Sequence, residues 1–105
     1  MTTVFYDPDR LRLTVEGHAG YAPAGEDLVC AAVSVLCWTL ISEAEAEERY
    51  HTETVADDKR AYIDVRCSPE GATAYACSYL FDIIVSGFAL LAENYPEYIS
   101  IKTGG

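Results

Sequence analysis

Positive charge is scarce in this sequence. Its 105 residues include 7 lysines and arginines against 17 aspartates and glutamates, which gives a formal net charge of −10. A surface this acidic argues against a nucleic-acid-binding face, so we expect no direct contact with nucleic acid. Acidic surfaces attract cationic partners, which favours a basic protein as the partner. The alternative is that the charge serves solubility alone.

The sequence also has little that would direct it to a membrane. The start, MTTVFYDPDRLRL, meets acidic residues and a proline before any apolar run develops, so we expect no signal peptide and a cytoplasmic protein. The apolar segment at residues 28–41 spans 14 residues, which is short for a bilayer span and typical of a buried core helix. We therefore expect no membrane partner.

Patterns typical of metal sites and disulfide frameworks are missing. The 4 cysteines contain no CxxC pair, and the sequence has only 2 histidines. We expect no zinc site, no other metal and no cofactor, and thiols that stay reduced in the cytoplasm. Cys37 lies two turns after Cys30 in the apolar segment and is predicted to be a small core residue.

Half of the residues are apolar, which predicts a folded chain, and the length predicts one domain over residues 1–105. Alternation and turn residues predict strands, and apolar stretches behind capping residues predict helices. The predicted strands are residues 2–6, 11–15, 53–57, 61–67 and 98–102, and the predicted helices are residues 28–41 and 69–93.

This order, β-β-α-β-β-α-β, predicts an α/β domain of the α+β type. We expect a two-layer sandwich in which two helices cover one face of a mixed or mostly antiparallel sheet of about five strands. The two β-β-α halves are expected to be related in topology. Two helices this apolar are hard to cover in so small a domain, so we also expect a homodimer that buries helix surface.

A histidine stands where a predicted strand ends, and a cysteine stands where a predicted helix begins. A loop between a strand end and a helix start brings both to one edge of a sheet, so His18 and Cys30 can meet. Asp27 is predicted to cap the helix, which makes Cys30 its third residue. In such a pair the thiolate is the nucleophile and the imidazole takes its proton. The helix N-terminus favours the thiolate, whereas Glu26 and Asp27 oppose it unless they point to solvent.

The loop between the two residues is rich in glycine and proline. It is either a mobile cover of the site, with Tyr21 over the cleft or a substrate side chain, or an ordinary surface connection. Trp38 is predicted to be core or a subunit contact. Asp82 could orient His18 as a third group, but a solvated helix face explains it more simply, so it is left out of the predicted site.

Residues 17–34 read GHAGYAPAGEDLVCAAVS, with a histidine, three glycines, an acidic pair and a cysteine at set spacings. This segment resembles the signature of the ribosomal-processing cysteine proteases, the Prp family, and the closing ENYPEYISI at residues 93–101 is similar to that family as well.

The resemblance implies a cysteine endopeptidase that removes the N-terminal extension of a large-subunit ribosomal protein precursor, the protein numbered twenty-seven. It implies His18 as the general base and Cys30 as the nucleophile. The alternative is a non-catalytic interaction module that binds a basic ribosomal protein, with Cys30 as a structural thiol.

Overall fold

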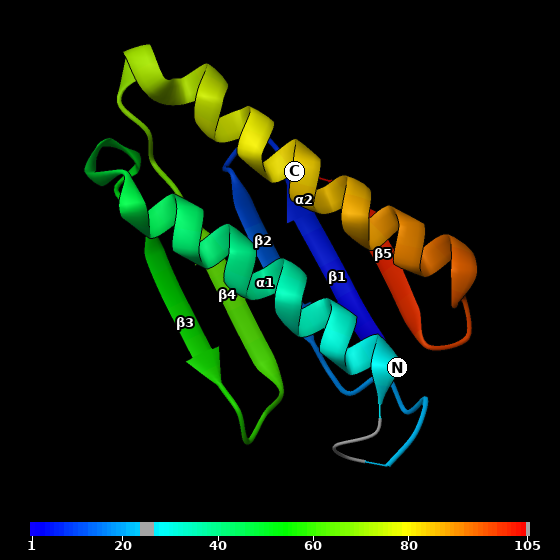
Figure 1. Ribbon diagram of the computed structural model, residues 1–105. Helices are drawn as coiled ribbons and strands as arrows, with labels where there is room; N and C mark the ends of the chain where they lie inside the picture. The colour runs from blue at the N-terminus through cyan, green and yellow to red at the C-terminus, as the bar shows by residue number, and fades with distance from the viewer. Residues whose placement is uncertain (24–26, 105) are drawn as a thin grey trace.

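The chain folds into two layers, a five-stranded sheet and two long helices that lie side by side on one of its faces (Figure 1). The structure is a computed structural model, and it describes residues 1–23 and 27–104. The strands are β1 (Thr2–Asp7), β2 (Arg12–Glu16), β3 (Glu53–Asp57), β4 (Tyr62–Arg66) and β5 (Ile99–Thr103), and the helices are α1 (Leu28–Ala46) and α2 (Ala74–Asn94). The predicted α+β sandwich with the order β-β-α-β-β-α-β is therefore confirmed.

The sheet is mixed, with the strand order β3-β4-β2-β1-β5, in which only the β1–β5 pair is parallel. Two hairpins of the same build supply four of the strands. In each turn an aspartate, Asp7 or Asp57, accepts hydrogen bonds from the backbone N–H groups two and three residues later. The hairpins meet through the antiparallel pair β2 and β4. The end of β2 therefore lies beside the start of β4 and the β3–β4 turn.

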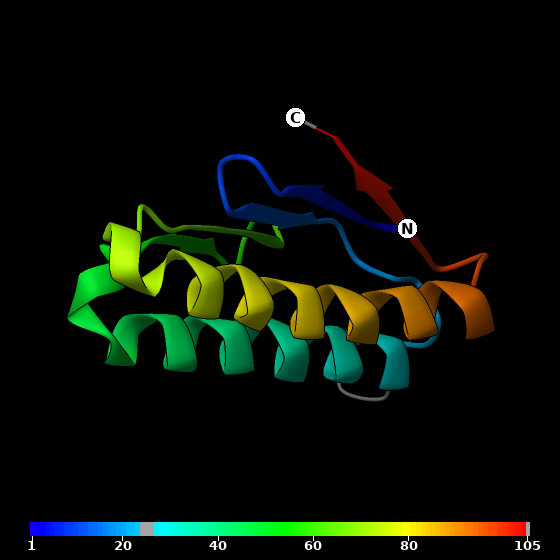
Figure 2. The same cartoon turned by 90° about the horizontal axis from the view of Figure 1, so that it is seen from above.

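Both helices turn one side to the sheet and leave the other side exposed (Figure 2). Helix α1 extends beyond the apolar stretch at residues 28–41 to Ala46, and its buried side includes Ala44, which is fully buried. By length and composition alone, α1 and the segment Gly71–Asn94 are long and apolar enough to cross a membrane. The prediction that the first helix is too short to do so was wrong. In the structure, one side of each helix is packed against the sheet.

The second helix begins later than predicted. The sequence predicts a start at Ser68, with Pro69 as the first helical residue, but the backbone is extended through Glu70 and α2 begins after a short 3-10 turn. The N–H of Ser68 donates to the carbonyl of Tyr50 (2.8 Å), and the N–H of Glu70 donates to the carbonyl of Arg49 (2.9 Å). These long-range bonds hold the segment extended and override the local capping signal.

Candidate active site

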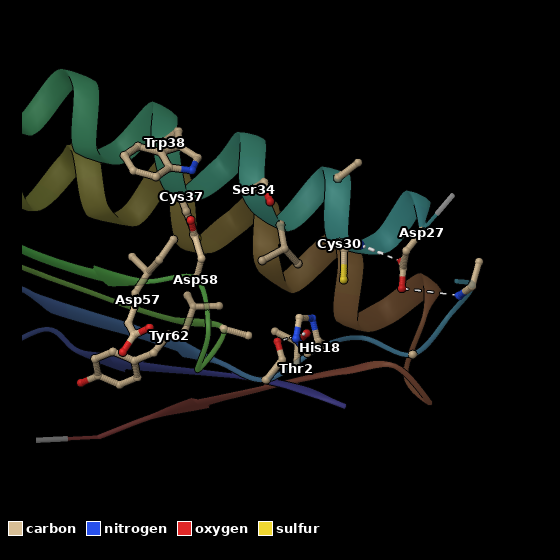
Figure 3. Close-up of a pocket in the computed structure, with 18 residues that line it drawn as sticks. Thr2, His18, Asp27, Cys30, Ser34, Cys37, Trp38, Asp57, Asp58 and Tyr62 are labelled. Carbon is tan, nitrogen blue, oxygen red and sulfur yellow. Dashed lines mark hydrogen bonds between the residues drawn. The ribbon is translucent and has the colours of Figure 1, made fainter. Parts of the chain in front are cut away.

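A cavity of about 640 Å³ lies between α1 and the end of the sheet where β2 leaves it. His18, two residues after β2, and Cys30, in the first turn of α1, both line this cavity. Figure 3 shows the Cys30 sulfur pointing from α1 into the space that also receives the His18 ring. The structure thus brings together the two residues that the sequence predicts as a pair.

Gly17 determines where His18 leaves the sheet. Its N–H donates to the carbonyl of Ala61 (2.8 Å), and its carbonyl accepts a hydrogen bond from the hydroxyl of Thr2 (3.1 Å). Its φ is +94°, and a Cβ at this position would lie 2.5 Å from the carbonyl oxygen of Met1. Both the positive φ and the close approach of the Met1 carbonyl require glycine at this position. The His18 side chain itself is exposed, so its ring has room to change rotamer.

Cys30 is the third residue of α1, and the predicted cap is confirmed because the Asp27 carboxylate accepts a hydrogen bond from the Cys30 N–H (2.9 Å). The sulfur of Cys30 accepts a hydrogen bond from the backbone N–H of Ala19 (3.4 Å). Within the described part of the chain, no hydrogen bond joins the His18 ring to this sulfur. The N–H of Ala19 and the N-terminal end of α1 both favour negative charge on the sulfur.

The Asp27 carboxylate connects the helix to the loop. One oxygen binds the Cys30 N–H, and the other accepts hydrogen bonds from the N–H groups of Tyr21 (3.1 Å) and Ala22 (3.4 Å). These backbone donors, the Cys30 N–H first among them, lower the pKa of Asp27. The negative charge of Asp27 is thus held by backbone N–H groups and does not point freely into solvent. The expectations for residues 25 and 26 lie outside the described residues.

Other residues that the sequence analysis named lie in different surroundings. Trp38 is not in the core, because its side chain is 51% exposed and lines the cavity two turns beyond Cys30. Cys37 is buried as predicted, and burial raises the pKa of its thiol to about 12. Asp82 is exposed on α2, and Tyr21 also lies outside the described lining of the cavity.

Sequence reasoning missed two features of this site. The first is the N–H of Ala19, which no side-chain pattern reveals. The second is the contact of Asp27 with the loop, for which a signal existed: an aspartate cap has two oxygens, and this cap follows a glycine-rich loop whose amides need acceptors. Among residues 1–23 and 27–104, no group of three or more histidine, cysteine, aspartate and glutamate side chains is arranged to hold a metal ion.

Comparison with known proteins identifies relatives of this chain. The sequence profile of the family described as cysteine protease Prp matches residues 2–100. The ribosomal processing cysteine protease Prp of Mycoplasma genitalium is 29% identical over 90 residues, which cover 86% of this chain and 85% of that protein.

Two solved structures share the fold. The essential ribosomal processing protease Prp from S. aureus, in complex with a covalently linked product peptide, matches with a TM-score of 0.87 at 18% identity, covering 99% of this chain and 100% of that chain. SMU.848 from Streptococcus mutans matches with a TM-score of 0.73 at 26% identity, covering 97% of this chain and 90% of that chain. Since the family profile spans almost the whole sequence, the chain belongs to the cysteine protease Prp family.

Proposed function

We propose that Cys30 is the nucleophile and His18 the general base of this cysteine protease. The observation that carries the proposal is the convergence of both side chains on one cavity, with the sulfur at a helix N-terminus and beside the N–H of Ala19. A rotation of the exposed His18 side chain brings its ring to the sulfur, where it takes the thiol proton.

The reaction then proceeds in two steps. The Cys30 thiolate attacks the peptide carbonyl carbon, and the sulfur loses its negative charge as the C–S bond forms. The Ala19 N–H, which binds the sulfur in the free protein, then turns to the resulting oxyanion together with N–H groups at the N-terminal end of α1. As the C–N bond breaks, the His18 imidazolium gives its proton to the leaving amine, which leaves a thioester. Water, deprotonated by His18, attacks this thioester and releases the carboxylic acid and the Cys30 thiol.

We propose that the peptide lies along α1 between Cys30 and Trp38. Both side chains line the cavity, with Ser34 between them. Eight helical residues advance about 12 Å, which corresponds to about four residues of extended peptide. Trp38 would therefore contact a substrate side chain about four residues from the cleaved bond.

The proposed substrate is a large-subunit ribosomal protein precursor with an N-terminal extension. The Mycoplasma genitalium relative is named a ribosomal processing protease, which supports this substrate class. A net charge of −10 fits a basic protein of this kind. We also propose a cytoplasmic location, which four free thiols support because thiols stay reduced in that compartment.

We further propose that two copies pair through the outer side of the helix layer. A groove between α1 and α2 is lined by Ala32, Val35, Leu36, Gly87, Leu90, Leu91, Asn94 and Tyr95, and no charged side chain is among these described residues. Val35 and Leu90 are 66% and 60% exposed. An uncharged surface lets two identical acidic chains approach closely, because no like charges face each other across it.

Light scattering behind size-exclusion chromatography tests this pairing. Wild type should elute with twice the chain mass, and Val35→Asp or Leu90→Asp should elute as a monomer. Val55→Asp, at a residue 54% exposed on the edge strand β3, is the matched control and should remain a dimer. A monomeric wild type at micromolar concentration would contradict the pairing.

The proposed function is tested with the ribosomal protein precursor, or a peptide that spans its cleavage junction. Wild type should cleave it, and Cys30→Ala and His18→Ala should not, because each removes a participant in the covalent route. Cys67→Ala and His51→Ala are the matched controls and should cleave as wild type does. Cleavage by Cys30→Ala with an unchanged circular dichroism spectrum would refute the assignment.

A further inference from the structure

Three tyrosines hold the outer end of the loop that carries His18. The ring of Tyr21 meets the ring of Tyr95 edge-on, with centroids 5.7 Å apart at 87°, and the ring of Tyr98 at 5.2 Å and 80°. We refer to Tyr21, Tyr95 and Tyr98 as the tyrosine cluster. In the described part of the chain its rings lie outside the lining of the cavity, so the cluster can influence the site only through the loop backbone.

Tyr95 and Tyr98 lie between α2 and β5, where hydrogen bonds fix the backbone. The N–H of Tyr95 donates to the carbonyl of Leu91 (2.7 Å), and the N–H of Tyr98 donates to the carbonyl of Tyr95 (3.0 Å). The carbonyl of Tyr98 accepts a hydrogen bond from the N–H of Thr2 at the start of β1 (2.9 Å). Tyr21 is thus attached to the edge of the sheet and the end of α2.

Tyr21 is close in sequence to the groups that face the sulfur. It follows His18 by three residues and Ala19 by two, and its own N–H binds the Asp27 carboxylate. Gly17 and Gly20, which are the two glycines with positive φ among the described residues, flank His18 and Ala19. Glycine backbones pivot easily, so the segment between them needs a fixed point beyond Gly20 to hold its position. The Tyr21 ring supplies that point.

We infer that Tyr98 and Tyr95 are positioning residues for the Cys30–His18 pair and act through Tyr21. The inference rests on the proposed function, because it concerns the placement of the two residues that we assign to catalysis. Offset and edge-on aromatic contacts fix ring orientation more closely than aliphatic contacts do. A small displacement of the loop moves the Ala19 N–H from the sulfur and carries the His18 ring with it.

A double-mutant cycle tests the inference. Tyr21→Leu and Tyr98→Leu should each lower kcat about tenfold or more with little change in KM, since misplaced catalytic groups affect the chemical step. Each should also slow labelling of Cys30 by iodoacetamide, measured by mass spectrometry. The double variant should be no slower than Tyr21→Leu alone, because Tyr21→Leu removes both ring contacts of the cluster and Tyr98→Leu removes one of the same two.

Tyr21→Phe and Tyr98→Phe keep the ring edges and should restore near-wild-type kcat and labelling. Tyr79→Leu is the matched control, because Tyr79 is 59% exposed on α2 and should tolerate the change without effect. If Tyr98→Leu unfolds part of the sheet edge, the result for Tyr21→Leu decides the question, because Tyr21 is an exposed residue of the loop.

The inference would be overturned if both leucine variants had the kcat and the Cys30 labelling rate of wild type. It would also be overturned if the losses in the double variant were purely additive. The proposed function fails separately. If wild type does not cleave the precursor while Cys30 labelling still depends on the tyrosine cluster, the positioning role stands and the protease assignment of the pair falls.

Discussion

Asp27 links the loop that carries His18 to the helix that carries Cys30. Its carboxylate accepts three backbone hydrogen bonds, from Cys30, Tyr21 and Ala22. A single side chain therefore caps α1 and holds the loop next to the sulfur, so the same residue contributes to stability and to the geometry of the site.

The lowered pKa of Asp27 predicts a pH dependence of stability. A carboxyl whose pKa is depressed on folding adds stability above the pKa of an unfolded aspartate, and this stability is lost as the pH falls through the lowered value in the folded state. Urea unfolding of wild type and Asp27→Asn should therefore differ near neutral pH and converge in acid. Asp82→Asn, at an exposed aspartate, is the control and should unfold at the same urea concentration as wild type both near neutral pH and in acid. If the free energies of unfolding of wild type and Asp27→Asn differed by the same amount at every pH, the lowered pKa of Asp27 would be contradicted.

Trp38 is predicted to bind substrate and to take no part in the chemical step. It is half exposed and lines the cavity two turns from Cys30. Trp38→Ala should raise KM for the precursor about tenfold and leave the iodoacetamide labelling of Cys30 unchanged, because a lost pocket contact weakens binding alone. Tyr75→Ala, at a tyrosine 85% exposed on α2, is the control. An unchanged KM in Trp38→Ala would remove Trp38 from the peptide path.

At the scale of elements, the two hairpins show why His18 and Cys30 both come from the first half of the fold. Both turn on an aspartate and lead into a helix. After β2 comes Gly17 with positive φ, then His18 and a long loop into α1, whereas β4 is followed by a short extended segment that pairs with residues 49 and 50. The longer first connection leaves the cavity open beside the end of the sheet.

Gly17 offers a test of that connection. Gly17→Ala should lower the free energy of unfolding by about 1–3 kcal/mol, because the φ is unfavourable and the new Cβ meets backbone. It should also reduce kcat, since His18 is the next residue. Gly71→Ala, with open space around the position, should change neither. Denaturant unfolding measures the first effect, and an unchanged stability in Gly17→Ala would contradict the close approach to Met1.

Local patterns predicted most of the elements, and long-range contacts account for what they missed. The strand at residues 53–57 and the cap at Asp27 follow from neighbouring residues, and both are confirmed. The late start of α2 depends on bonds to residues 49 and 50, which no local pattern contains. The site divides in the same way: His18 and Cys30 are readable in the sequence, whereas the partners of Tyr21 lie more than seventy residues further along the chain.

The whole molecule is strongly acidic, and its charge should act on substrate capture. With a net charge of −10 and a basic precursor, the association rate measured by stopped flow should fall as salt rises to physiological strength, where the screening length is about 8 Å. An uncharged junction peptide should show little salt dependence. Equal salt dependence for the precursor and this peptide would exclude the acidic surface from substrate capture.

The coupling of the two site residues across the cavity is the central claim, and alkylation measures it in the free protein. Iodoacetamide labelling is followed by mass spectrometry across pH in wild type, His18→Ala and the control His51→Ala. In wild type, Cys30 should label fastest, well ahead of Cys37, whose pKa is about 12. Loss of His18 should slow Cys30 and move its labelling midpoint to higher pH, and loss of His51 should not. The same rate and midpoint in wild type and His18→Ala would contradict the claim that the imidazole acts on this thiol.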